Sequence, residues 1–590
     1  MNGKAIIFRV AAICLPLMLL VATEGLLRLA GVARDTREVF TALPGQPDYL
    51  TINPQYARRY FHTFEPSVAF NPFLKSKSAE TFRVFVLGGS TTAGFPYQFY
   101  HGFPGRLGAR LQAHAPDRHI EVINLGMTAV NSYTLWDLKD AVARAEPDAI
   151  IIYAGHNEYY GAFGAGSSVY TLGNRRILKR LMLRLKRTVL YTLVERLLAV
   201  GSQVAAPPGL DRTMMARVVR DATIALDGRV YHAGVRQFEA NMEDVLGTFR
   251  RRGVPVYIGM LVANLRDQPP LGEDMGAVAA YDQGREHIMQ GDTVQARHAF
   301  LESVEHDDIR FRAPGAMNGA IRRFAHEASV TLVDIAAAFR NASPQGVEGS
   351  DLFTDHLHPN ARGYALMADR FFEALRQHPR LMLPAEPGIA ATAAIDPVDE
   401  AHAMLQILRL KGGYPFDKVA DAEHQAEKFR ALLQAYLASR RWADSLGAVL
   451  VTLEKTPPEV LLEATRLARS RSDTLAALLS YRSLLYWQPF NASLMQEAIG
   501  FAHTDRSCEP LVADLAQIAV RATGGIDYLN LLAAIRICQG WMTVAEALLA
   551  RVEARDPTSK VMLFNKARLL VLQGDTTEAR TYFERYRSGE

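Results

Sequence analysis

The chain has 590 residues, which is too many for one core at the usual size of roughly 100 to 200 residues per domain. Hydrophobic residues make up 49% and charged residues 22%, so wholesale disorder, a collagen-like repeat and a multi-span transporter are excluded. Lys and Arg total 66 against 62 Asp and Glu, and a net charge of +4 over this length argues against a nucleic-acid partner. The three cysteines form no Cys-x-x-Cys pair, so neither a structural zinc site nor a thioredoxin-like redox site has support.

The N-terminal segment is locally apolar. The run 10–23 carries no charge and follows Lys4 and Arg9. It is shorter than the ~20 apolar residues that span a bilayer, unless the helix extends over about 5–32. The pattern favours an uncleaved signal anchor in residues 1–35 over a cleaved signal peptide. Because positive residues precede the apolar run, we expect a single membrane-anchoring helix with the bulk of the chain extracytoplasmic, in the periplasm.

Alternating strand and helix patterns follow this segment. Helical stretches are predicted at 104–113 and 135–145, between runs typical of buried strands. This alternation predicts a doubly wound α/β layer, whose active site lies beyond the carboxyl ends of its strands. The predicted strands are 82–87, 121–130, 148–161, 254–265 and 330–335.

Four short polar segments accompany these runs. They read Gly-Gly-Ser-Thr at 88–91, Asn-Leu-Gly-Met at 124–127, Gly-His-Asn-Glu at 155–158 and Asp-His-Leu-His at 355–358. Small residues around Ser90 allow a tight turn that presents its hydroxyl at the end of a strand. In this order the segments resemble the signature blocks of the SGNH branch of the GDSL-like hydrolases.

The resemblance implies a three-layer flavodoxin-like fold with a parallel sheet, a Ser-His-Asp mechanism and no cofactor. Ser90 would be the nucleophile, His358 the general base and acid, and Asp355 the group that orients the imidazole. The oxyanion hole would come from the backbone N–H groups of Ser90 and Gly126 and from the side-chain amide of Asn157. The first block departs from Gly-Asp-Ser-Leu, and the third from the commoner Gly-x-Asn-Asp, but neither change removes a catalytic atom.

Alternative assignments exist at the acid end of the site. His356 or Asp351 could exchange places with the two chosen partners after a shift of register. A metal site built from Asp355, His356 and His358 lacks a further His or Cys cluster to complete a tetrahedral set, so no metal is predicted.

Three further residues are predicted to contact the substrate. They are Asn264, Arg266 and His156, each near the end of a predicted strand. For Arg266, a surface loop in which it pairs with Asp267 is an equally good interpretation. The stretch 310–314 has the same ambiguity.

The insert 174–200 alternates basic residues with leucines. As an amphipathic helix it suits anionic lipid headgroups, and the other interpretation is a core-packed helix with a solvated cationic face.

Repeats of tetratricopeptide type are predicted in the C-terminal part. Ala533, Gly540, Ala545 and Leu549 recur 34 residues later as Ala567, Gly574, Ala579 and Phe583. A related unit, 279–314, is inserted between the fourth and fifth strands. Such arrays bind peptides or proteins in a groove, and an architectural role is the alternative. Cys508 and Cys538 could pair across helices of the array, although two buried free thiols are the simpler expectation.

Together these patterns divide the chain into an anchor, a lead-in segment, a hydrolase domain with its insert, a linker and a helical array, at 1–35, 36–80, 81–378, 379–399 and 400–590. The whole resembles anchored SGNH hydrolases with tetratricopeptide repeats. The expected activity is that of a serine esterase acting on an acylated small molecule, lipid or glycan of the cell envelope. An O-acyltransferase with the same residues and a non-enzymatic repeat scaffold are the alternatives.

Overall fold

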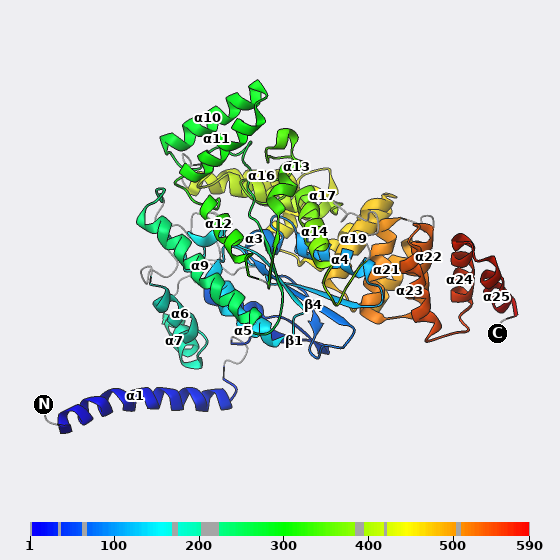
Figure 1. Cartoon of the computed structure of the whole chain (residues 1–590), viewed down its shortest axis with the longest axis horizontal. Coiled ribbons are helices and arrows are strands. Elements are labelled where there is room, and N and C mark those ends of the chain that lie inside the picture. Colours follow the sequence, from blue (N-terminus) through cyan, green and yellow to red (C-terminus); the bar gives the residue numbers. More distant parts are fainter. Residues whose placement is uncertain are drawn as a thin grey trace.

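The structure is a computed structural model of the chain, and the residues that it describes are 3–32, 37–61, 68–167, 175–201, 223–327, 329–383, 394–417, 422–502 and 509–588. Cys508 and much of the predicted linker lie outside these ranges. Figure 1 shows α1 at one end of the molecule and the last helices at the other.

The centre of the molecule is a five-stranded parallel sheet in the order β5-β4-β6-β7-β8. This strand order is the flavodoxin-like one, in which the first strand of the sheet is paired with the second and the third. Every residue of β4 is buried, including Arg83, which pairs with Glu121 on β5, because helices cover both faces of the sheet. The strands are β4 (Thr81–Gly88), β5 (His119–Asn124), β6 (Ala149–Tyr153), β7 (Val256–Gly259) and β8 (Val330–Val333).

Helices cover both faces of the sheet and complete three layers (Figure 1). On one face lie α4 (Phe103–His114), α13 (Ile335–Ala342) and α14 (Ala361–Leu375); on the other lie α5 (Ser132–Arg144), α9 (Arg229–Arg250) and α12 (Gly315–Phe324). The predicted α/β class is confirmed. The first predicted strand has nearly the expected limits, whereas β5, β6, β7 and β8 end earlier than expected because the segments after them leave the sheet.

The lead-in segment forms a small antiparallel sheet beside the main one. Its strands are β1 (Phe40–Leu43), β2 (Gln46–Ile52) and β3 (Phe73–Leu74), and the short helix α2 (Pro54–Ala57) follows β2. The hydroxyls of Tyr56 and Tyr60 donate hydrogen bonds of 2.7 and 2.8 Å to the Asp137 carboxylate on α5. These buried bonds tie the segment to the α/β domain.

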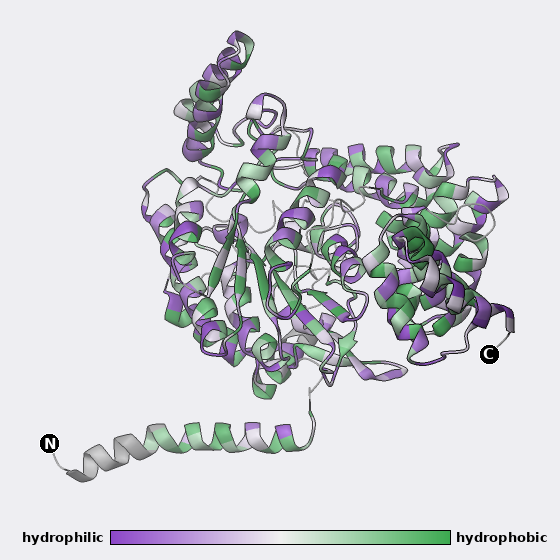
Figure 2. Ribbon diagram, turned by 45° about the vertical axis from the view of Figure 1, so that its right-hand side comes forward, coloured by the Kyte–Doolittle hydropathy of each residue, from purple (hydrophilic) through white to green (hydrophobic). Residues whose placement is uncertain are grey.

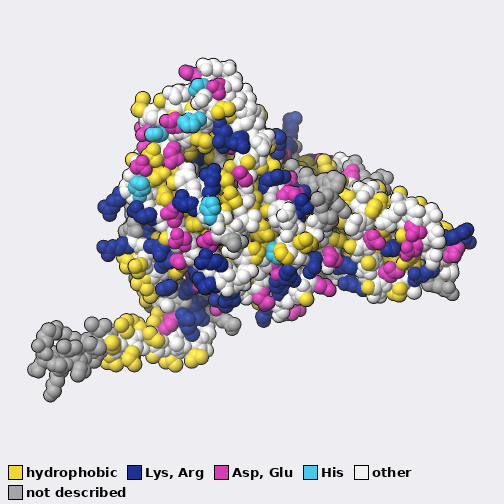
Figure 3. All heavy atoms as spheres, viewed as in Figure 1, with side chains coloured by type: hydrophobic (Ala, Val, Ile, Leu, Met, Phe, Trp, Pro, Cys, Tyr) yellow, Lys and Arg dark blue, Asp and Glu magenta, His cyan; other side chains and the backbone are white. Residues whose placement is uncertain are grey.

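The N-terminal helix α1 (Gly3–Leu29) stands apart from the body of the molecule, and hydrophobic side chains cover the part of it that Figure 3 colours. Among the residues that the structure describes, no helix has both the length and the apolarity needed to cross a membrane. The anchor in residues 1–35 therefore stays a prediction.

The basic insert differs from both expectations, because part of its charged face points into the protein. In α6 (Arg176–Leu185) the side chain of Lys179 is buried, 1% exposed, and its Nζ donates a 2.7 Å hydrogen bond to the Phe163 carbonyl. Arg180 likewise turns inward and donates to Asn241 on α9. By contrast Ile177 is 79% exposed. Lys179 and Arg180 face the protein because carbonyl, amide and carboxylate acceptors lie there, whereas most of the apolar side chains of the helix, Leu183 excepted, are exposed.

The following helix, α7 (Val189–Gly201), connects the insert to α1. The Glu24 carboxylate of α1 accepts hydrogen bonds of 3.0 Å from the first backbone N–H groups of α7, those of Val189 and Leu190. An acidic side chain at a helix N-terminus is a favourable cap. The two apolar helices are therefore joined by a specific contact.

The C-terminal part is a stack of helices, as the predicted all-α array requires. Its elements are α15 (Pro397–Lys411), α16 (Ala422–Leu437), α17 (Trp442–Thr452), α18 (Pro457–Ser470), α19 (Thr474–Trp487), α20 (Ala492–Ala502), α21 (Pro510–Thr523), α22 (Ile526–Cys538), α23 (Met542–Glu553), α24 (Lys560–Gln573) and α25 (Thr576–Ser588). Cys538 is disulfide-bonded, so the expected free thiol is wrong for this residue.

The glycines of the predicted repeats occupy equivalent turns. Gly540 and Gly574 separate the helices of the last two pairs, and Gly291 separates α10 (Met275–Gln290) from α11 (Thr293–His306). All three have positive φ, of 82°, 89° and 80°, which glycine adopts without strain. The insert projects from the body as a hairpin (Figure 2). Assignment of these pairs to the tetratricopeptide class stays a prediction, as do the domain limits.

The array packs directly on the α/β domain. Tyr100 stacks on Tyr486 of α19 with ring centroids 5.1 Å apart, and Phe99 meets Trp487 edge-on at the same distance. Farther along, Arg551 of α23 donates a hydrogen bond to the Pro116 carbonyl. These aromatic contacts place α15 to α23 beside the hydrolase core rather than at the end of a free linker.

Candidate active site

Ser90 follows β4 directly and begins a short helix, α3 (Ser90–Ala93), at the carboxyl edge of the sheet. The turn needs small residues: a Cβ on Gly88 would lie 2.0 Å from the Thr92 hydroxyl, and one on Gly89 would lie 2.9 Å from the Asn157 amide nitrogen. The backbone N–H of Ser90, as the first of α3, has no intrahelical acceptor. The turn therefore presents a hydroxyl and a backbone N–H that, among the residues the structure describes, donates no hydrogen bond.

Ser90, His358 and Asp355 are brought together in one hydrogen-bonded line. The Ser90 Oγ lies 2.7 Å from Nε2 of His358, and Nδ1 of the same ring lies 2.6 Å from Oδ2 of Asp355. The other oxygen of Asp355, Oδ1, accepts the backbone N–H groups of Leu357 and His358 at 2.9 and 2.8 Å. The short loop thus fixes the carboxylate against the imidazole.

Electrostatics keep this carboxylate ionised. Burial alone would raise the pKa of Asp355, but the neighbouring His358 and His356 and their hydrogen bonds hold it well below its usual range. An ionised carboxylate accepts the proton of Nδ1, which leaves Nε2 with a lone pair toward the Ser90 hydroxyl. This tautomer is the one that can take a proton from the serine.

Asn157 and Gly126, the two predicted oxyanion partners of Ser90, differ in their surroundings. Asn157 lines the cavity at Ser90, and its amide donates one hydrogen bond to the Val130 carbonyl at 3.1 Å, leaving the second N–H available. The Gly126 N–H instead donates to the Asn124 side chain at 2.8 Å. A donor already engaged behind the cavity wall cannot stabilise an oxyanion, so the assignment of Gly126 needs correction.

Ala129 is the residue on this segment that reaches the cavity. It lines the cavity together with Ser90 and has a φ of 55°, a left-handed conformation that is rare for a residue with a Cβ. Within the described part of the chain, its N–H donates no hydrogen bond. The sequence did not predict this role, because Gly126 was the only residue of the block suited to a close backbone approach, whereas Ala129 reaches the cavity through its backbone conformation.

His356 and His156 lie behind the triad. His356 lines the cavity, and its Nδ1 is 3.3 Å from the Asp355 carboxylate. His156 does not line the cavity; its Nδ1 accepts the Ala313 N–H at 3.2 Å. Burial, with His356 and His358 nearby, lowers the pKa of His156 to about 3, so the ring is neutral. The substrate contact predicted for His156 is not supported by this position.

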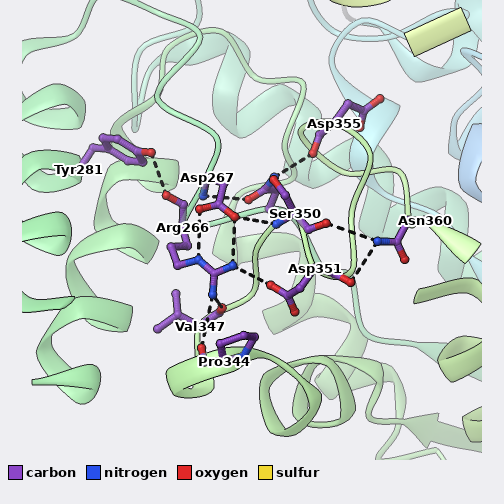
Figure 4. A network of polar contacts seen from close by, with 10 residues as sticks. Arg266, Asp267, Tyr281, Pro344, Val347, Ser350, Asp351, Asp355 and Asn360 are labelled. Carbon is purple, nitrogen blue, oxygen red and sulfur yellow. Dashed lines mark hydrogen bonds and ion pairs between the residues drawn. The ribbon is translucent and has the colours of Figure 1, made fainter. Parts of the chain in front are cut away.

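Asn264 and Arg266, also predicted to bind substrate, instead contact the loop that carries Asp355 and His358. Figure 4 shows Arg266 against Asp351 in this loop. The Arg266 guanidinium contacts the carboxylates of Asp351 and Asp267 at 2.7 and 3.0 Å. The Asn264 side chain donates to the Asp355 carbonyl at 3.2 Å, and its N–H donates to the His356 carbonyl at 3.0 Å. Both side chains make contacts within the protein, and for Arg266 these include the pairing with Asp267 that was the alternative to a substrate contact.

The two arginines of the stretch 310–314 also make contacts within the protein. The Arg312 guanidinium contacts Asp307 at 3.0 Å and the Asn264 carbonyl at 3.1 Å, and Arg310 donates to the Ile224 carbonyl at 2.9 Å. Both arginines are buried. They are structural supports of the region around the site.

The cavity at Ser90 has a volume of about 100 Å³ and a mainly apolar wall. Besides the triad's Ser90 and His358, its lining consists of Phe95, Thr128, Ala129, Asn157, Tyr160, Gly161, Phe311, His356, Leu357 and Leu410. The ligand-type atoms of Asp355, His356 and His358 lie within 4.8 Å of one another, but the Asp355 oxygens already accept hydrogen bonds. The arrangement suits a nucleophilic attack at the wall of a mainly apolar cavity.

Comparison with known proteins places this domain. Residues 86–366 match the family model described as GDSL-like Lipase/Acylhydrolase. No curated protein matches the chain.

Three solved structures resemble half of the chain. A putative lipolytic protein of the G-D-S-L family from Desulfitobacterium hafniense is 14% identical and covers 50% of this chain and 99% of its own, with a TM-score of 0.26. An acetyl xylan esterase is 14% identical and covers 50% and 100%, with a TM-score of 0.28. A GDSL-like lipase from Bacteroides thetaiotaomicron is 12% identical and covers 50% and 88%, with a TM-score of 0.26. These TM-scores are too low to carry an argument. From the family match, the chain carries a GDSL-like hydrolase domain, and its enzyme class is that of the ester-bond hydrolases.

Proposed function

We propose that the protein is a serine esterase that removes acyl groups from an ester of the cell envelope through an acyl-enzyme. The Ser90 Oγ attacks the carbonyl carbon of the ester while Nε2 of His358 takes the hydroxyl proton. The bond to the alcohol oxygen then breaks, and the proton passes from His358 to that oxygen. Water repeats the sequence on the acyl-enzyme, releasing the carboxylic acid and restoring the Ser90 hydroxyl.

The observation that carries this proposal is the line of contacts from Ser90 through His358 to Asp355, with distances of 2.7 and 2.6 Å, at the wall of an apolar cavity. Its geometry matches the roles of nucleophile, base and orienting acid. The N–H groups of Ser90 and Ala129 and the amide of Asn157 supply donors near the position of a developing oxyanion.

Hydrolysis of 4-nitrophenyl acetate by the purified full-length chain tests the activity. We expect Ser90→Ala to lower kcat by at least about 10,000-fold, and Ser78→Ala, an exposed serine ahead of β4, to keep it. Undiminished turnover in Ser90→Ala would refute the mechanism, and no turnover in the unmodified chain would favour the scaffold. Acyl transfer to added glycans in place of water would favour the transferase.

The cellular location is part of the same proposal. Exposed apolar side chains gather on α1 and on the outer faces of α6 and α7, and Glu24 joins α1 to α7. Such a continuous apolar surface is stabilised by lipid rather than by water. The supporting residues on α1 are Leu15, Leu17, Met18, Leu19, Leu20, Val21, Leu26 and Leu29.

A reporter that is active only outside the cytoplasm, fused after Glu590, tests this location together with cell fractionation. We expect reporter activity in the membrane fraction. Activity of a reporter that works only in the cytoplasm would overturn the topology, and recovery of the full chain in the soluble fraction would overturn the membrane association.

A further inference from the structure

The C-terminal end of α15, the first helix of the array, forms part of the wall of the catalytic cavity. Leu410 lines this cavity together with Ser90 and His358. Six residues later, Phe416 packs edge-on against His356 with ring centroids 5.3 Å apart. Two separate contacts thus bring the segment after the linker to the reacting groups, although it lies outside the residues matched by the family model.

The other end of α15 is clamped to the α/β domain. Asp396 caps the helix, and its carboxylate lies 3.3 Å from Nε2 of His101. The Gln98 N–H donates to the Asp399 carboxylate at 3.0 Å, and the Ser483 hydroxyl of α19 donates to Asp396 at 2.6 Å. All of these carboxylates are buried. A helix of 15 residues is about 22 Å long, so the clamp fixes where Leu410 arrives.

The cavity leaves little room for an acyl chain. Its volume is about 100 Å³ and its wall is mainly apolar, which favours a small apolar acyl group there over a large polar glycan.

We propose that the helical array determines the acyl-chain specificity of the enzyme: Leu410, held by α15, closes the acyl pocket with Phe95 and Phe311 and restricts it to short acyl groups such as acetyl. This inference rests on the proposed esterase function and names its substrate class. It also gives the array a role at the active site that needs no partner protein. A leucine at the wall excludes a longer chain because the packed aromatic neighbours cannot move aside without loss of contact.

The test measures kcat/KM of the full-length chain for 4-nitrophenyl acetate, butyrate and hexanoate. We expect acetate to be preferred, and Leu410→Ala to reduce the ratio of kcat/KM for acetate to that for hexanoate by about tenfold or more. Leu408→Ala, two residues away on the same helix and 38% exposed, is the matched control and should keep the ratio.

A second variant, together with thermal unfolding, shows whether a change in specificity results from loss of the fold. Leu410→Phe adds volume at the same wall and should lower butyrate hydrolysis several-fold more than acetate hydrolysis, with thermal unfolding measured for every variant. An unchanged ratio in both Leu410 variants, or a preference of the unmodified chain for hexanoate, would overturn the inference. Absence of any Ser90-dependent hydrolysis would instead overturn the proposed function, so the two failures are distinguishable.

Discussion

The serine and histidine sides of the catalytic cavity are held by different kinds of contact. On the serine side, Ser90 is positioned by its own neighbours in the chain, where Gly88 and Gly89 allow a turn that any Cβ would obstruct. On the histidine side, the loop with Asp355 and His358 is supported by polar side chains that arrive from segments about 90 residues upstream (Figure 4). A local motif can encode the first kind of support, whereas the second depends on long-range packing.

The largest expected effect tests the histidine side. Asp355→Asn should lower kcat by about 10,000-fold, because an amide in place of the carboxylate no longer holds the imidazole tautomer that accepts the serine proton. Asp351→Asn is the matched control, since Asp351 bonds to Arg266 and not to His358. Its kcat should fall by roughly tenfold or less. A larger loss in Asp351→Asn than in Asp355→Asn would restore the shifted assignment of the acid.

The next effect tests the serine side. Asn157→Ala should lower kcat by about 100- to 1,000-fold with little change in KM, because the lost amide stabilises charge that develops only in the transition state. Steady-state kinetics with 4-nitrophenyl acetate measure the split. A rise in KM at constant kcat would show instead that the amide contacts the ground-state ester.

The polar network gives an intermediate effect. Arg266→Ala should lower kcat by roughly tenfold through displacement of the catalytic loop. In a double-mutant cycle with Asp351→Ala, the two effects should be strongly non-additive, since the side chains form one ion pair. Additive effects accompanied by a raised KM would return Arg266 to its predicted role as a substrate contact.

Glu158 is buried beside the segment that carries Asn157. We expect its titration to affect the stability of the fold rather than the activity. Burial raises the pKa of Glu158 to about 7, although hydrogen bonds from Ser132 oppose the shift. The folded chain therefore holds this proton more tightly than the unfolded chain, whose Glu pKa is about 4.3. The stabilisation is full below that value and is lost as the pH rises toward 7.

Urea unfolding of the unmodified chain and Glu158→Gln at several pH values measures this effect. Relative to the variant, the free energy of unfolding of the unmodified chain should fall by up to about 1.4 kcal/mol per pH unit between pH 5 and 7. Glu459→Gln, at an exposed helix cap, is the control. A difference that does not change with pH would contradict the buried titration.

Much of the fold and the triad could be predicted from the sequence, because they depend on patterns short enough to read locally. The β-branched runs gave the five parallel strands, and the blocks around Ser90 and His358 gave the reacting groups. The predictions were incomplete where one residue type has two possible roles. An arginine near a strand end, such as Arg266, can bind either an anionic substrate or a carboxylate of the protein. Only the folded structure shows that Asp351 lies beside it.

The α6 helix and the cavity wall show the same limit. The sequence of α6 shows which residues share a face of the helix but not which face points into the protein. Buried carbonyl groups near Lys179 favour the burial of this lysine. Leu410 belongs to no motif, and its place at the cavity follows from the contacts that hold the other end of α15. The oxyanion segment adds a third case, in which backbone conformation at Ala129 outweighs the visible glycine.

Covalent labelling of the full-length chain with a fluorophosphonate tests the central claim most directly. The account predicts attachment to Ser90, with loss of fluoride, that disappears in Ser90→Ala and becomes much slower in His358→Ala, because Nε2 of His358 is the group that activates the hydroxyl. Labelling at another residue, or labelling of Ser90 at an undiminished rate without His358, would contradict it.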